Sequence, residues 1–253
     1  MNSQVQANGF ESDSLEIGSH QPVRPVLELS GIVHRYGRSF VLRGANLSLA
    51  RGEVLALYGS NGAGKTTLLK IISGAQSPTR GHVRIFNLEA RDRAQIRART
   101  LLVSHSLGLY PELNGFENLE FAARMHLRNL PKSRFESVLE RVGLAGVKTR
   151  VRGYSSGMRK RLALAKMLLL EPDLVLLDEP FAALDPAGKV LVSELLTLER
   201  TRGATLIVSS HEPELTSKIA TLETTLEAGL LSVPVPPNLG MPNLGMPILG
   251  NSG

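Results

Sequence analysis

The stretch "GSNGAGKT" holds the residues best suited to phosphate chemistry. It matches the pattern G-x-x-x-x-G-K-[ST], and a strand before it and a helix after it would give that pattern its usual context. The glycines let backbone N–H groups turn inward around phosphate oxygens, the lysine adds a positive charge, and the threonine hydroxyl can ligate Mg²⁺. We therefore predict a nucleotide-binding loop composed of Gly59, Ser60, Asn61, Gly62, Ala63, Gly64, Lys65, Thr66 and Thr67.

A pair of carboxylates ends the apolar run "LVLLDE". Asp178 would lie at the carboxyl end of a buried strand, where it can hold the Mg²⁺ shell through water. Glu179 can orient or deprotonate an attacking water, a role that typically contributes about 10²–10⁴-fold to the rate. A GTPase would need the guanine-reading motif N-K-x-D, and the sequence has none. The two motifs together predict a nucleotide hydrolase.

The elements that must position these residues are also visible in the sequence. "EVLALY" precedes the glycine-rich loop and "KTTLLKIISG" follows it, which predicts a strand and a helix. "DLVLLDEP" and "ATLIVSSH" are short apolar runs typical of strands buried on both faces of a parallel sheet, with a helix between them. "VLELSGIVHRYG" and "FVLRGANLSLARGEVLALYG" alternate apolar and polar residues, which predicts early strands in antiparallel pairing.

The organisation of the chain follows from this pattern. Residues 89–165 read as helical and Arg-rich, which predicts an inserted helical subdomain. Residues 1–25 are polar and residues 232–253 repeat "NLGMP", so both are expected to be disordered tails around a nucleotide-hydrolysing domain at 26–231. The predicted fold class is an α/β P-loop nucleotide hydrolase, with a mixed-sheet core, an antiparallel β subdomain and the helical insertion.

Composition limits the remaining possibilities. The 253 residues include no cysteine, which excludes disulfides and thiolate metal sites. No run approaches the roughly 18 apolar residues of a membrane span, and no secretory signal is visible, so a cytoplasmic protein that is soluble by itself is expected. The net charge of +6 suits nucleic acid, anionic lipid or nucleotide phosphates, and equally an ordinary solvated surface.

The segment "YSSGMRKR", residues 154–161, predicts the start of a helix. Ser155 and Ser156 suit the N-cap and first turn, and Gly157 permits a close backbone approach to an anion. The basic residues that follow oppose the helix dipole, which suggests that negative groups lie nearby. By itself the segment could equally be an ordinary capped helix.

Five patterns occur in one order: "GSNGAGKTT", "YSSGMRKR", "LVLLDEP", "AALD" and "VSSH". With them the chain resembles the ATP-binding-cassette ATPases from about Val26 to Leu231. The resemblance implies ATP and Mg²⁺ as cofactors and a second ATPase subunit, since Ser155, Ser156 and Gly157 would face the γ-phosphate of the partner's ATP. It further implies that Glu179, His211 and Lys65 are catalytic, that Tyr36 stacks on adenine, that Asp185 belongs to a loop linking the two sites, and that Thr66, Asp178 and His105 serve the metal.

Two departures from the family pattern stand out. Tyr154, Ser156 and Met158 replace the usual Leu, the first Gly and the Gln of the helix-start motif, while Ser155 and Gly157 are kept. His105 stands where the family normally has a Gln that reaches Mg²⁺ and reports the nucleotide state to the membrane partner. Its charge would change with pH near 6.5.

A single cassette without a membrane span implies either separate transmembrane subunits or a soluble function, and the resemblance favours the first, at the cytoplasmic face of the membrane. His105, "YPELNGFENLEFAARMH" and the 154–161 segment look like the ATPase subunits of haem exporters in cytochrome c maturation. ATPases of drug or polysaccharide exporters are alternatives. A soluble ATPase acting on nucleic acid or ribosomes and a non-hydrolysing regulatory binder also remain open, although no nucleic-acid partner is expected.

Overall fold

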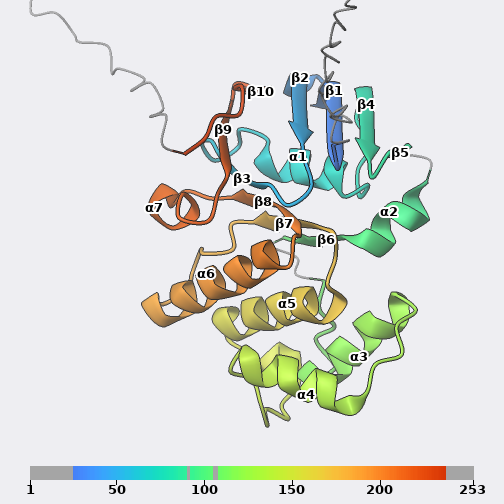
Figure 1. The fold of residues 1–253 in the computed structure, drawn as a ribbon, viewed down its shortest axis with the longest axis vertical. Helices are drawn as coiled ribbons and strands as arrows, with labels where there is room; N and C mark the ends of the chain where they lie inside the picture. The colour runs from blue at the N-terminus through green and yellow to red at the C-terminus, as the bar shows by residue number, and fades with distance from the viewer. Residues whose placement is uncertain (1–24, 90–91, 105–107, 238–253) are drawn as a thin grey trace, which may run out of the picture.

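The computed structural model describes residues 25–89, 92–104 and 108–237. Its centre is a six-stranded sheet with the order β10-β9-β3-β8-β7-β6 (Figure 1). Strands β3, β6, β7, β8 and β9 pair in parallel and β10 is antiparallel to β9, so the sheet is mixed as predicted. The strands span Val54–Tyr58 (β3), Thr100–Val103 (β6), Leu174–Asp178 (β7), Thr205–Ser209 (β8), Leu222–Glu227 (β9) and Leu230–Leu231 (β10).

A second, antiparallel sheet has the order β2-β1-β4-β5 and forms the predicted β subdomain. Its strands are Leu27–Tyr36 (β1), Ser39–Leu49 (β2), Arg80–Ile85 (β4) and Leu88–Glu89 (β5). Helix α1, Lys65–Ile72, lies between the two sheets (Figure 1). Its apolar residues join those of both sheets in one core.

The other face of the central sheet is covered by helices (Figure 1). They are α5 (Ser156–Leu170) and α6 (Pro186–Thr201), while α3 (Gly115–Met125) and α4 (Lys132–Arg141) pack on the far side of α5 and a short 3₁₀ turn lies at Val151–Gly153. Alternate residues of β7 belong to two different hydrophobic cores. Leu174 and Leu176 pack in the core that contains α1, and Val175 and Leu177 pack in the core that contains α5 and α6. This period of two explains why the buried strand reads as an unbroken apolar run.

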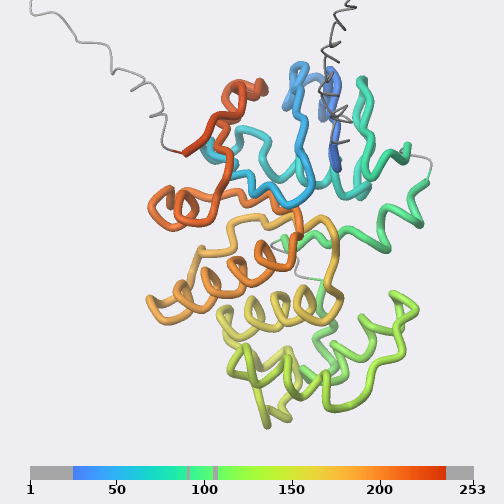
Figure 2. The backbone as a smooth tube through the Cα atoms, viewed as in Figure 1, coloured from blue at the N-terminus to red at the C-terminus, as the bar shows by residue number. Residues whose placement is uncertain are grey.

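The predicted helical insertion at 89–165 also contains a strand of the central sheet. The backbone leaves the antiparallel sheet, passes through α2 (Arg93–Arg99) and enters β6 before it reaches α3 (Figure 2). β6 pairs in register with β7, from Thr100 opposite Leu174 to Val103 opposite Leu177. It was missed because four residues next to an Arg-rich helix are too few to show a strand period. The last helix of the insertion extends to Leu170.

The C-terminal boundary lies further along the chain than predicted. Residues 232–237 were expected to begin a loose tail. In the structure the Ser232 hydroxyl accepts a hydrogen bond from the Thr225 N–H, and Val235 and Glu223 exchange two backbone hydrogen bonds. The predicted tails at 1–24 and 238–253 lie outside the described residues. A short helix α7, Pro213–Thr216, completes the elements, and none of the described helices is long and apolar enough to cross a membrane.

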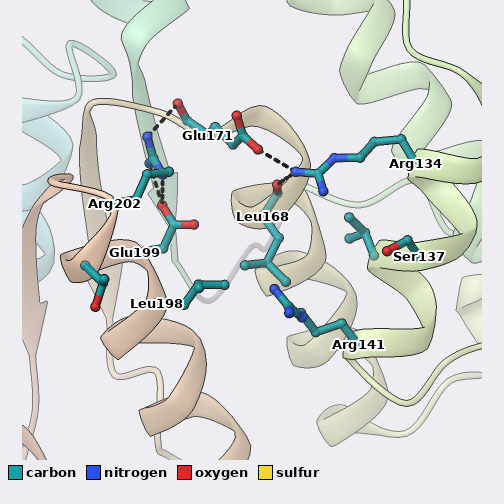
Figure 3. A pocket seen from close by; sticks show the side chains of 10 residues that line it. Arg134, Ser137, Arg141, Leu168, Glu171, Leu198, Glu199 and Arg202 are labelled. Atoms are coloured by element: carbon teal, nitrogen blue, oxygen red, sulfur yellow. Dashed lines mark hydrogen bonds and ion pairs between the residues drawn. The ribbon is translucent and has the colours of Figure 1, made fainter.

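A polar cleft of about 350 Å³ separates α4 from α6 over the end of α5 (Figure 3). Arg134 donates to the Leu168 carbonyl oxygen and pairs with Glu171, and Arg202 pairs with Glu199 and donates to the Glu171 carbonyl oxygen. These contacts tie the end of α5 to α4 and α6. Glu199 is 2% exposed, and its burial raises the pKa of the carboxyl despite the hydrogen bond from Arg202.

Glu199 is expected to make the stability of the fold depend on pH. Because the folded state holds this proton more tightly than the unfolded state does, its stabilising contribution is complete at acidic pH. The contribution is lost as the pH rises above about 4.3 and through the raised pKa. In urea unfolding, the wild-type free energy of unfolding should therefore fall with pH relative to that of Glu199→Gln. The exposed Glu194 on the same helix provides the control: Glu194→Gln should keep the wild-type pH dependence, and a Glu194→Gln profile that matches that of Glu199→Gln would contradict the assignment.

Candidate active site

The predicted phosphate loop, residues 59–66, connects β3 to the start of α1. Gly59, Gly62 and Gly64 have φ values of +143°, +81° and +109°, which side chains rarely tolerate. A Cβ at Gly59 would lie 2.4 Å from the Leu226 carbonyl oxygen, and one at Gly64 would lie 2.9 Å from the side chain of Val41. The glycines are therefore required by the packing of the loop, which wraps the N-terminal end of α1.

The three residues predicted to be catalytic meet beside this loop. Lys65 is 6% exposed; its Nζ donates to the Gly59 carbonyl oxygen at 2.7 Å and lies 3.5 Å from Glu179 Oε1. His211 Nε2 lies 3.1 Å from both Lys65 Nζ and Glu179 Oε1, and 2.7 Å from Asn61 Oδ1. Although both nitrogens are near, the buried Glu179 Oε1 makes no hydrogen bond with the described residues. It is therefore a buried acceptor with unused hydrogen-bonding capacity, held between Lys65 and His211.

Thr66 and Asp178 form an oxygen pair next to this cluster. Thr66 Oγ1 donates to Asp178 Oδ2 at 2.6 Å, and Ser209 Oγ donates to Asp178 Oδ1 at 2.8 Å. The Glu179 N–H in turn donates to Ser209 Oγ at 3.0 Å. A hydroxyl and a carboxylate fit Mg²⁺, which prefers oxygen ligands and usually keeps waters and substrate phosphates in its shell. Among the described residues no group of three His, Asp or Glu side chains forms a dedicated metal cage.

The strand topology brings these residues together. β3, β7 and β8 are parallel neighbours, and Ser209 is in register with both Leu57 and Asp178. The carboxyl ends of the three strands consequently meet at one edge of the sheet, where ligands bind in open α/β sheets.

Tyr36 lies at the end of β1 and lines the same pocket as the phosphate loop, Asp178 and Glu179. The pocket has a volume of about 310 Å³. Tyr36 is 52% exposed, and its hydroxyl accepts a hydrogen bond from Gln76 Nε2 at 2.8 Å. This hydrogen bond is the main cause of the lowered pKa of Tyr36. The ring therefore has one end fixed and an accessible surface on which a base could stack.

The other predicted ligands lie away from this pocket. Ser155 is the N-cap of α5 and accepts a hydrogen bond from the Met158 N–H at 3.1 Å, and Ser155 and Ser156 are exposed. Asp185 caps α6 by accepting from the Gly188 N–H at 2.9 Å. Within one chain neither group lines the pocket at the phosphate loop. His105 lies outside the described residues.

Three contributors to the site were not predicted. Ser209 stands in the quoted "VSSH"; its hydroxyl donates to the Asp178 carboxylate and accepts from the Glu179 backbone N–H, but only His211 was singled out there. Gln76 has no recognisable sequence pattern. Lys160, in the 154–161 segment, donates to the carbonyl oxygens of Glu179 and Ala182. Its contacts agree with the prediction that negative groups lie close to these basic residues.

The fold and the site define a P-loop nucleotide hydrolase. The family model "ABC transporter" matches residues 42–182, and the chain belongs to this family. It is thus an ATP-binding subunit that couples ATP hydrolysis to transport.

Relatives with known names support this assignment. The chain is 38% identical over 177 residues to the cytochrome c biogenesis ATP-binding export protein CcmA of Methylococcus capsulatus, covering 69% of this chain and 86% of that protein. It is 35% identical over 189 residues to the bacitracin transport ATP-binding protein BcrA of Enterococcus faecalis, covering 74% of this chain and 61% of the relative. The dimeric structure of MJ0796, a bacterial ABC transporter cassette, superposes with a TM-score of 0.75 at 25% identity over 83% of this chain and 98% of that one.

Proposed function

We propose that this chain is the ATPase subunit of an exporter that serves cytochrome c biogenesis, with haem as the cargo. The observation that carries this proposal is the extent of the match to CcmA, which includes 86% of that protein, whereas the match to BcrA includes 61%. A drug or polysaccharide exporter is the second candidate, because the identity to BcrA is nearly as high.

The phosphate loop would bind the phosphates of ATP through its N–H groups and Lys65, while Tyr36 stacks on the adenine. Thr66 and Asp178 would hold Mg²⁺, which neutralises charge on the transferred phosphoryl group. Glu179 would accept a proton from the attacking water, and His211 would contact the γ-phosphate. The unused hydrogen-bonding capacity of Glu179 Oε1, which lies beside Lys65 and His211, supports this role.

Hydrolysis would take place in a dimer with two shared sites. Ser155, Ser156 and Gly157 lie at an exposed helix start, outside their own chain's pocket, so they are available to a nucleotide held by a partner. Bound ATP would close the two chains on each other, and the products would release them. Such a cycle uses ATP as the ligand that biases a two-state element.

A membrane subunit would dock on α3 and the turns at its two ends. Tyr110, Phe121, Met125 and Leu127 are exposed there, with Met125 and Leu127 at 68% and 96%, and the rings of Tyr110 and Phe121 pack edge to face. Exposed apolar side chains gathered in one place suit a protein partner. The chain would then work at the cytoplasmic face of the membrane.

Affinity purification of the tagged chain from detergent-solubilised native membranes tests this proposal. A multi-span subunit accompanied by cytochrome c maturation proteins is expected, and Met125→Glu should lose that subunit while retaining ATP binding. Recovery of a multi-span subunit with no maturation proteins would overturn the haem assignment in favour of the second candidate. Recovery of nucleic acid or ribosomal proteins without a membrane subunit would overturn the export proposal.

A further inference from the structure

Lys160 connects the start of α5 to the loop that follows β7. Its half-buried Nζ donates to the Glu179 carbonyl oxygen at 2.8 Å and to the Ala182 carbonyl oxygen at 2.6 Å. Burial lowers the pKa of this amine, and attraction to the carboxylates of Glu179 and Asp178 partly offsets the effect. The ammonium is therefore kept in a place where its desolvation is costly.

The backbone that Lys160 holds has an unusual conformation. Glu179 and Ala183 have φ values of +54° and +58°, a region that is strained for non-glycine residues and persists only where surrounding contacts fix it. On one side of Glu179, its N–H donates to the Ser209 carbonyl oxygen and hydroxyl. On the other side, its carbonyl oxygen accepts from Lys160. The direction of the Glu179 side chain depends on both.

Lys160 also belongs to the helix whose first turn is exposed. Ser156 and Lys160 are four residues apart on α5, about 6 Å along one face of a continuous helix. Both line a cavity of about 200 Å³ together with Asp178 and Ala182. A movement of the first turn would be carried directly to the Nζ of Lys160.

We propose that Lys160 is a positioning residue that aligns Glu179 with the first turn of α5. A phosphate of the partner's nucleotide, bound at Ser155–Gly157, would fix α5 and thereby place this chain's own Glu179 for hydrolysis. The proposal rests on the proposed function, in which Glu179 activates water and the two sites are shared. It adds a path within one chain by which the occupancy of one site governs the other.

Arg134, on α4, provides a matched control because it contacts the opposite end of α5. Like Lys160, Arg134 is a cation that donates to a backbone carbonyl oxygen. Its acceptor is Leu168 of α5, at 3.0 Å, and it also pairs with Glu171 (Figure 3). None of its contacts reaches the loop after β7. Arg134→Met should therefore lower the thermal unfolding midpoint without changing the kinetics of hydrolysis.

The test is steady-state ATP hydrolysis by the full-length Lys160→Met chain, with nucleotide binding measured separately. The turnover number should fall roughly 10- to 100-fold, because a misplacement of about 1 Å can cost about 10²-fold. The KM and the affinity for ATP should stay within about twofold, because the phosphate loop is untouched. The Hill coefficient for ATP should fall toward one, and Lys160→Arg should restore part of the turnover number.

Three results distinguish a failure of the proposed role of Lys160 from a failure of the proposed function. An unchanged turnover number and Hill coefficient in Lys160→Met would overturn the role of Lys160. A Lys160→Met chain that does not fold would move the test to Lys160→Gln, where turnover equal to that of the wild type would overturn the role as well. A Glu179→Gln chain that hydrolyses ATP normally would instead overturn the proposed function on which the role depends.

Discussion

Replacement of Glu179 by glutamine is expected to reduce ATP hydrolysis by about 10²–10⁴-fold and to leave ATP binding intact. Glutamine has the same shape but cannot accept a proton as the Glu179 carboxylate would in the proposed mechanism. The substitution also removes a negative charge from the surroundings of Lys65, 3.5 Å away, so affinity for the phosphates should not weaken. In ATP and Mg²⁺ the variant should therefore accumulate as a dimer.

Phosphate release and analytical ultracentrifugation measure these two effects. Glu194→Gln, on the exposed face of α6, makes the same chemical change away from the site and should behave as the wild type. A Glu179→Gln chain that remains monomeric in saturating ATP and Mg²⁺ would contradict the shared-site proposal. Normal hydrolysis by this chain would show that another group activates the water.

Replacement of Lys65 by methionine is expected to abolish most nucleotide binding. The lysine is buried, and it supplies the positive charge at the centre of the cluster formed with Glu179 and His211. Hydrogen bonds to charged groups contribute about 1.5–3 kcal/mol, so the loss of one or two should weaken ATP binding by at least roughly tenfold. Repulsion of the phosphates by the unpaired Glu179 carboxylate would add to this loss.

Titration with a fluorescent ATP analogue measures the affinity of Lys65→Met. Lys132 lies on α4 with its side chain 76% exposed, and Lys132→Met provides the control. If Lys65→Met keeps the wild-type affinity, the phosphates do not bind where the loop is expected to hold them. A double variant with Glu179→Gln separates the two causes, because it should recover part of the affinity if repulsion contributes.

The parts of the fold that could be predicted are those where local pattern and burial agree. β7 and β8 are buried on both faces, so their apolar runs predict strands. The phosphate loop was predictable because its glycines are required by backbone geometry within a few residues. β6 was not, since its strand character comes from pairing with β7, more than seventy residues away. The same applies to Val235, whose partner Glu223 is set by the tertiary fold.

The residues of the site also divide into those that a sequence pattern predicts and those that depend on tertiary contacts. Lys65, Glu179 and His211 were predicted together because motif resemblance carries information about distant contacts that spacing alone does not. Ser209 and Lys160 reach Glu179 across 30 and 19 positions of the chain, and a serine or a lysine at such positions is ordinary in composition. Their role depends on the left-handed backbone of Glu179, which no local pattern in the sequence reveals.

The most direct measurement is ATP hydrolysis by an equimolar mixture of two impaired chains, Lys65→Met and Ser156→Arg. Ser156 is exposed at the start of α5, so arginine there should block the approach of a partner's nucleotide without disturbing the fold. In a mixed dimer one site combines an intact phosphate loop with an intact first turn of α5. Two shared sites predict that the mixture hydrolyses ATP well above the mean of the two chains measured alone. If mixed dimers form but activity stays at that mean, or if Ser156→Arg alone is fully active, the sites are not shared.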